Sequence, residues 1–162
     1  MERPEEKLRL HTIGDIEIPE GTTIEGLEPL RRFDAYVLIA PPESGMDRRF
    51  AKEAQQTGSR SLHMSCRDFV CFHEHRSKHD ESWREAQTYF LHGFEELRAD
   101  VEGQWLDQDP RIGLDKLRGA IDRVRPARMR LLTTPDMWLG KNDEIHLARV
   151  APGRKLVIAT WC

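Results

Sequence analysis

Apolar and polar side chains follow two different periods along the chain, and each period predicts a different kind of element. Over residues 7–11 and 15–18 they alternate, which predicts two short strands, while 33–40 is a continuous apolar run typical of a buried strand. A capping pattern beginning at Ser44 then predicts a short helix. Extended structure is expected to return over residues 61–72.

The second half of the chain begins with helical spacing. Residues 83–105 and 110–125 each open with a capping signal and carry apolar side chains three and four positions apart. They predict two consecutive amphipathic helices joined by a short turn. The strand period returns at residues 129–133, 145–150 and 156–161, which predicts a C-terminal antiparallel sheet. Strands and helices in this order predict a single α+β domain spanning residues 1–162.

Composition narrows the class of protein without identifying a reaction. The chain of 162 residues is 38% hydrophobic and 33% charged, which suits a folded domain with its own core. A net charge of -3 gives no overall attraction to nucleic acid or to an anionic membrane. The longest apolar run is too short to cross a bilayer, and the acidic first residues do not resemble a signal peptide. Three cysteines, an odd number, favour reduced thiols, so we expect a cytoplasmic protein.

Four of the seven histidines fall within residues 62–82, together with two of the three cysteines and several carboxylates. If this segment is a strand, alternation puts Cys71, His73 and His75 on one face. If it is a helix, Cys71, His75 and His79 stack in a row. Three ligands suit a catalytic metal with an open position, and zinc is one candidate. The alternative is a solvated polar loop without a site.

Residues 128–162 resemble the closing strands of Fe(II)/2-oxoglutarate-dependent oxygenases of the prolyl-hydroxylase type. In that family a late histidine completes an iron site and a basic residue nine or ten positions later binds the co-substrate. The resemblance implies a double-stranded β-helix as the alternative fold, and the leading functional hypothesis is a small metal-dependent oxidoreductase. The helices expected over residues 83–125 depart from the family, which has barrel strands there. The implied site is Fe(II) held by His79, Glu81 and His146, with 2-oxoglutarate held by Lys155 or Arg154.

A second resemblance concerns the strand and helix of residues 33–58 followed by His63-Met64-Ser65. This order resembles the first half of a two-histidine phosphoesterase, in which each histidine acts as a general acid or base without a metal. The second motif would fall at His146, where Ala148 replaces the expected hydroxyl. Nucleotides or RNA would be the substrates.

Two further patterns also indicate phosphate chemistry. Arg67 and His73 fit the loose arginine and histidine spacing of HEPN-type ribonucleases, in which the arginine would stabilise phosphate charge. Arg111, Arg118 and Arg125 repeat every seven residues along the second long helix, and such a stripe could contact phosphates. The non-enzymatic alternative is a protein-binding or nucleic-acid-binding module that uses this stripe, although such rows are commonly a solvated helix face.

Overall fold

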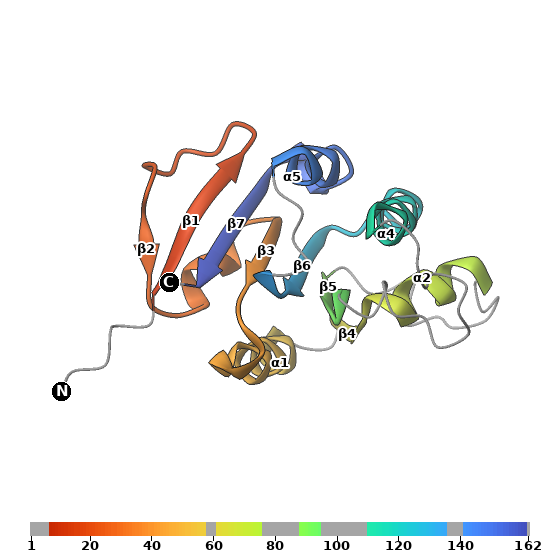
Figure 1. Cartoon of the computed structure of the whole chain (residues 1–162), viewed down its shortest axis with the longest axis horizontal. Helices are drawn as coiled ribbons and strands as arrows, with labels where there is room; N and C mark the ends of the chain where they lie inside the picture. The colour runs from red at the N-terminus through yellow and green to blue at the C-terminus, as the bar shows by residue number, and fades with distance from the viewer. Residues whose placement is uncertain (1–6, 58–60, 76–87, 95–109, 136–140, 162) are drawn as a thin grey trace.

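The computed structural model describes residues 7–57, 61–75, 88–94, 110–135 and 141–161, and the structural statements below concern these residues (Figure 1). Its elements in chain order are β1 (Leu8–Ile13), β2 (Thr23–Ile24), η1 (Glu28–Arg32), β3 (Ala35–Ile39), η2 (Pro42–Ser44), α1 (Met46–Thr57), β4 (Ser61–Ser65), α2 (Cys66–His75), β5 (Thr88–His92), α4 (Pro110–Val124), β6 (Arg128–Thr133), α5 (Lys141–Ala148), η5 (Pro152–Arg154) and β7 (Leu156–Trp161). None of the described helices combines the length and apolar composition that a membrane crossing requires.

The strands form one seven-stranded mixed sheet in the order β2-β1-β7-β3-β6-β5-β4. The five strands from β7 to β4 are parallel, while β1 pairs antiparallel with β7 and β2 pairs antiparallel with β1. Helices together with a sheet of mixed direction confirm the α+β class expected from the sequence.

The strand β3 lies at the centre of this sheet because its side chains can be buried on both faces. All five of its residues are buried, which is the pattern of a parallel strand covered by helices on each side. Val37 and Ile39 belong to one hydrophobic cluster, while Tyr36 and Leu38 belong to the other. Alternation along one strand thus joins the sheet to two separate cores.

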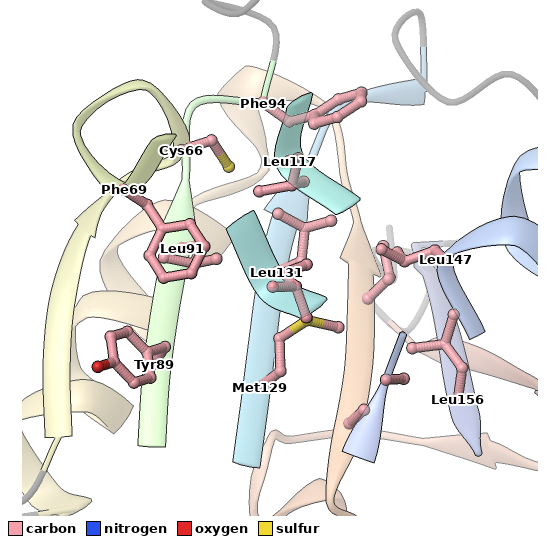
Figure 2. Packing of buried hydrophobic residues seen from close by; sticks show 14 of the residues in the cluster. Cys66, Phe69, Tyr89, Leu91, Phe94, Leu117, Met129, Leu131, Leu147 and Leu156 are labelled. Atoms are coloured by element: carbon pink, nitrogen blue, oxygen red, sulfur yellow. The ribbon is translucent and has the colours of Figure 1, made fainter. Parts of the chain in front are cut away.

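Helices cover the two faces unequally. Buried side chains of α2, α4 and α5 share the larger cluster, and Figure 2 shows Leu117 of α4 lying over Leu131 and Met129 of β6. The other face is covered by α1, whose Phe50 is fully buried, and by η1. Figure 1 accordingly shows α1 on the opposite side of the sheet from α4 and α5.

Five sequence predictions are wrong in their detail. The strand expected over residues 15–18 does not form, and β1 pairs instead with β2 at Thr23–Ile24. Residues 83–105 do not form one helix, because Thr88–His92 is strand β5, which pairs with both β4 and β6. Residues 145–150 were expected as a strand, but Lys141–Ala148 is helix α5. The extended segment expected over 61–72 ends early, since α2 begins at Cys66. The C-terminal sheet is not antiparallel, because β6 and β7 both run parallel to β3. By contrast, β3, α1, α4, β6 and β7 lie where the sequence predicts them.

The chain connections create a switch point between β3 and β6. After β3 the chain crosses the face that carries α1 and reaches β4 at the far edge of the parallel strands. After β6 it crosses the opposite face through α5 and reaches β7, on the other side of β3. Two neighbouring strands therefore send their connections in opposite directions. In open parallel sheets, ligands bind outside the carboxyl ends of the strands at such a point.

Gly14 lies in the turn after β1, where it packs closely against Arg154 and Lys155, and a substitution there tests this contact. Its φ is +96°, and an added Cβ would lie 2.9 Å from the carbonyl oxygen of Arg154 and 3.2 Å from Cγ of Lys155. We expect Gly14→Ala to lower the free energy of unfolding by about 1–3 kcal/mol, because it combines a left-handed backbone with a steric clash. Urea denaturation measures the change.

Gly119 in α4 is the matched control for this substitution. A Cβ there meets nothing within 4 Å. Gly119→Ala should therefore stabilise the protein, by about 0.5–1 kcal/mol, because alanine is the better helix residue. If Gly14→Ala left stability unchanged or raised it as Gly119→Ala does, the turn geometry at Gly14 would be wrong.

Candidate functional site

A hollow of about 360 Å³ opens at the carboxyl edge of the parallel strands, beside the switch point between β3 and β6. This volume suits a small ligand. Residues following β3 and β6 form two of its walls, the first turns of α1 form a third, and histidines of β4 and β5 complete it. The lining residues are Ala40, Pro41, Pro42, Met46, Asp47, Phe50, His63, His92, Gly93, Leu132, Thr133 and Thr134.

The hollow contains two histidines whose rings touch. His63 of β4 stands opposite Phe90 in the strand register, and His92 of β5 stands opposite Ser65, two positions further along. His63 and His92 are therefore diagonal neighbours on the same face of the sheet. Their ring centroids are 4.8 Å apart at an angle of 54°. Two strands that are distant in sequence thus bring two proton-transfer groups to one wall.

The helix α1 supports this pair from the face of the sheet. The fully buried ring of Phe50 lies edge-on to His63 at 6.0 Å and to Phe90 at 5.3 Å between centroids. Its contact with a rigid core aromatic restricts how the His63 ring can turn. The histidine pair is therefore held by packing on one side while His63 stays exposed to solvent on the other.

The start of α1 faces the hollow through Met46 and Asp47. Gly45, with a φ of +80°, turns the chain from η2 into the helix, and a Cβ there would meet nothing nearby. The hydroxyl of Ser44 accepts a hydrogen bond from the Met46 N–H at 3.3 Å and donates one to the Pro41 carbonyl at 2.7 Å. Further N–H groups in the first turn have no partner within the helix, and the helix dipole places partial positive charge there.

Electrostatics favour the neutral form of His63. Partial burial lowers the pKa of His63 below its usual 6.5, and the neighbouring His92 lowers that pKa further. Asp47, His63 and His92 are the titratable side chains of the described residues that line the hollow. A neutral imidazole at pH 7 is ready to accept a proton.

Thr133 adds a polar group that the fold leaves unsatisfied. The residue is 1% exposed, and its Oγ1 finds no hydrogen-bond partner in the part of the chain that the structure describes. Its carbonyl oxygen is occupied, because it accepts the Ala40 N–H at 3.1 Å. A buried hydroxyl without a partner is costly in a folded protein. At the edge of a hollow, such a group suggests a ligand contact.

The histidine-rich segment is not the strand that one of the metal-site predictions assumed. Cys71, His73 and His75 lie in helix α2 rather than on a strand. The strand that was expected to align the three residues ends at Ser65, so the strand expectation is wrong, while this metal set stays a prediction. His79, from the helical alternative, lies outside the described residues, as do the side chains of 71–75. Across the ranges described, no three His, Cys, Asp or Glu side chains gather in a way that could hold a metal.

The oxygenase resemblance loses the element on which it rested. His146 lies in helix α5 rather than on a closing strand, and its Nδ1 is buried without a described hydrogen-bond partner. Arg154 ends η5 at the amino end of β7, and Lys155 follows it. His79 and Glu81 fall outside the described residues, so the Fe(II) and 2-oxoglutarate site stays a prediction. The described residues do not show the strand pair that this site requires.

The two-histidine resemblance predicts a site that pairs His63 with His146, and the structure does not place these two residues together. His63 lies on β4 as expected, but its ring neighbour is His92 rather than His146. The helix α5, which carries His146, contacts α4, β1 and β7, at the other side of the sheet from β4. The missing hydroxyl at Ala148 therefore no longer bears on this site.

The remaining predicted residues are not among those that line the hollow. Arg67 is in the first turn of α2, and His73 is near its end. Arg118 lies on α4 as predicted and pairs with Asp115 at 3.1 Å, whereas Arg125 directly follows the end of this helix at Val124. The side chain of Arg111 lies outside the described residues.

His92 is the functional residue that sequence reasoning missed. The sequence predicts a helix over residues 83–105, and a helix would not place His92 beside His63 at the edge of the sheet. The run Thr88–His92, rich in aromatic and β-branched residues and followed by Gly93, was the available signal for a strand ending at the sheet edge. Such an ending would have placed His92 near the carboxyl edge.

Comparisons with protein-family models, with curated proteins and with solved structures gave no match for this chain. The hollow, its two histidines and its place at the switch point therefore carry the functional interpretation.

Proposed function

We propose that the carboxyl-edge hollow hydrolyses a small phosphate ester, with His63 and His92 as the acid and base. The observation that carries this proposal is the contact between the two imidazoles, 4.8 Å apart, on the rim of a hollow at the switch point of the sheet. Paired histidines suffice for phosphoester cleavage because one can accept a proton while the other donates one.

The lowered pKa of His63 supports His63 as the base and leaves the acid role to His92. His63, whose pKa is lowered, takes the proton from a water molecule as the water oxygen bonds to phosphorus. The ester P–O bond breaks, and a protonated His92 gives its proton to the departing oxygen. One proton leaves the nucleophile and one reaches the leaving group, so the step balances. A positive charge on His92 also favours the neutral form of His63, which is the form that this role needs.

The remaining walls suit the phosphate and the rest of the ester. The first-turn N–H groups of α1 can bind phosphate oxygens, as helix N-termini commonly do. The hydroxyls of Thr133 and Thr134 offer further donors. Pro42, Met46 and Leu132 provide an apolar surface for the organic group.

Hydrolysis assays on the purified chain test the proposal. The probes are p-nitrophenyl phosphate, bis(p-nitrophenyl) phosphate and a 2′,3′-cyclic nucleotide, each measured with and without EDTA. We expect turnover of at least one ester that EDTA leaves unchanged. No turnover of any ester would contradict the proposal. So would turnover that EDTA abolishes and Fe(II) restores, because the reaction would then depend on a metal and not on the histidine pair alone.

The pH dependence of this turnover follows from His63. Because its pKa lies below 6.5, the neutral base predominates at pH 7. We expect kcat/KM to fall on the acidic side only at pH values below 6.5, as His63 becomes protonated. A pH series at constant ionic strength measures this limb. An acidic limb centred above 6.5 would assign the base to a different group.

A further inference from the structure

A second hollow, of about 540 Å³, lies at the opposite edge of the sheet from the histidine pair. It sits where α4 leads into β6 and where α5 and η5 lead into β7, so it opens at the amino ends of these strands. We call it the amino-edge hollow. Its lining residues are Asp122, Arg125, Pro126, Arg149, Val150, Ala151, Pro152, Gly153 and Arg154.

Three arginines from three different segments converge on the amino-edge hollow. Arg125 follows α4, Arg149 follows α5, and Arg154 ends η5, and all three are exposed. None of them forms an ion pair with a carboxylate of the described residues. Asp122 is the one acidic side chain of the lining. The hollow therefore concentrates positive charge on a chain whose net charge is -3.

Two of these arginines hold unusual backbone conformations. Arg125 has a φ of +51° and Arg154 a φ of +57°, and they are the two non-glycine residues with positive φ in the described ranges. A left-handed conformation is costly for a residue with a long side chain, and glycine or asparagine would relieve it. Retaining strained residues where easier ones would fit is typical of functional sites.

The arginines of the predicted stripe have different surroundings in the structure. Arg118 has a partner, because its Nη1 donates a hydrogen bond to Asp115 at 3.1 Å. Arg125, seven residues later, instead joins Arg149 and Arg154 around the hollow. The structure thus replaces a linear stripe with a concave cluster, which suits a compact ligand better than an extended one.

We propose that the amino-edge hollow binds a compact polyanion carrying two or more phosphate groups. Planar guanidinium groups match phosphate oxygens and can donate two hydrogen bonds at once. Three such groups around one concave surface can bind adjacent phosphates together, and Asp122 limits the net charge of the site. This site is separate from the histidine pair and does not depend on the proposed esterase reaction.

Isothermal titration of the full chain with inorganic tripolyphosphate tests the proposal. We expect saturable binding that weakens as salt is added. Arg125→Asn, Arg149→Gln and Arg154→Asn should each weaken it about tenfold, through the loss of a charge-assisted contact. The asparagine variants should melt at the same temperature as the parent chain or higher, because asparagine tolerates the left-handed backbone. ATP as a second ligand distinguishes a nucleotide from a free polyphosphate, because a nucleotide site binds ATP more tightly.

Two control variants make the result specific. Arg118→Gln removes a paired arginine of the same helix and should leave binding within about twofold of the parent. The double variant His63→Asn with His92→Asn should bind tripolyphosphate unchanged. The proposal is overturned if tripolyphosphate does not bind, if Arg118→Gln weakens it as much as the three hollow variants, or if only the histidine variant loses it.

Discussion

His63→Asn is expected to lower kcat/KM for the hydrolysed phosphate ester by about 10²–10⁴-fold, the usual contribution of a general base. Asparagine keeps the approximate size and polarity of the imidazole but cannot accept the proton at neutral pH. His63 is exposed and its ring lies beside Phe50 and His92 without a hydrogen bond among the described residues, so the fold should tolerate the change. Steady-state kinetics and circular dichroism on the same preparation give both values.

Companion variants distinguish a catalytic pair from a single base. His92→Asn should cause a loss of similar size, and the double variant should lose little more than either single one, because acid and base act as a unit. His11→Asn is the matched control, since His11 lies on β1 and has Glu144 as its neighbour at 3.6 Å. Full activity in His63→Asn, or an equal loss in His11→Asn, would contradict the proposed roles.

The elements that the sequence predicts correctly show either a clear helical period or an apolar run with sharp ends. In α4 one face is buried and the other is charged, so Leu117 and Ile121 stand out against Asp115 and Asp122. In β3 the uninterrupted apolar run, ended by prolines, is itself the signal of a strand covered on both faces.

The misassigned elements fail for physical reasons that a single sequence does not reveal. In Thr88–His92 the first four residues are buried, so no alternation remains and the run merges with neighbouring apolar residues into apparent helical spacing. In α5 the large apolar side chain of Ile145 is 46% exposed while Leu147 is fully buried. Because polar and apolar residues alternate over 145–150, the sequence of this helix resembles that of a strand.

For a related reason, the sequence identifies only one of the two histidines of the candidate site. His63 could be identified because it followed a strand, a helix and a second strand start in the order of a known motif. Its companion depends on the sheet order, because β4 and β5 are neighbours only through their parallel pairing. A diagonal contact across two parallel strands has no fixed sequence spacing, so His92 becomes visible only once the register is known.

Arg130 is a buried cation whose partners are carbonyl oxygens instead of a carboxylate. It is 4% exposed, and its Nη1 donates hydrogen bonds to the carbonyls of Phe33 at 2.6 Å and Met129 at 3.4 Å. Its Nη2 donates to the carbonyl of Arg31 at 3.3 Å, and its guanidinium lies 4.8 Å from the ring centre of Tyr36. Burial lowers the pKa of Arg130 and raises that of Tyr36, so the phenol stays neutral beneath the cation. One side chain thus ties β6 to the chain between η1 and β3.

Arg130→Met should therefore destabilise the protein by about 3 kcal/mol, although methionine fills part of the same volume. The loss arises because the carbonyls of Phe33 and Arg31 lose a buried charged donor and the contact with Tyr36 disappears. Arg130→Lys should also destabilise, since an ammonium group keeps the charge but not the planar fork that spans these carbonyls.

Arg32→Met is the control for Arg130→Met, because Arg32 is exposed although its guanidinium also lies over an aromatic ring, that of Phe33, at 4.7 Å. Its effect should stay within about 0.5 kcal/mol, as for most surface substitutions. Urea unfolding at pH 7 measures both changes. Below its melting temperature, Arg130→Met should retain the parental kcat, because Arg130 holds the amino end of β6 while the histidine pair lies at the carboxyl edge. Equal stability of the two variants would show that the carbonyl contacts of Arg130 contribute nothing to stability. A lower kcat in folded Arg130→Met would show that the amino edge of the sheet affects the reaction at the carboxyl edge.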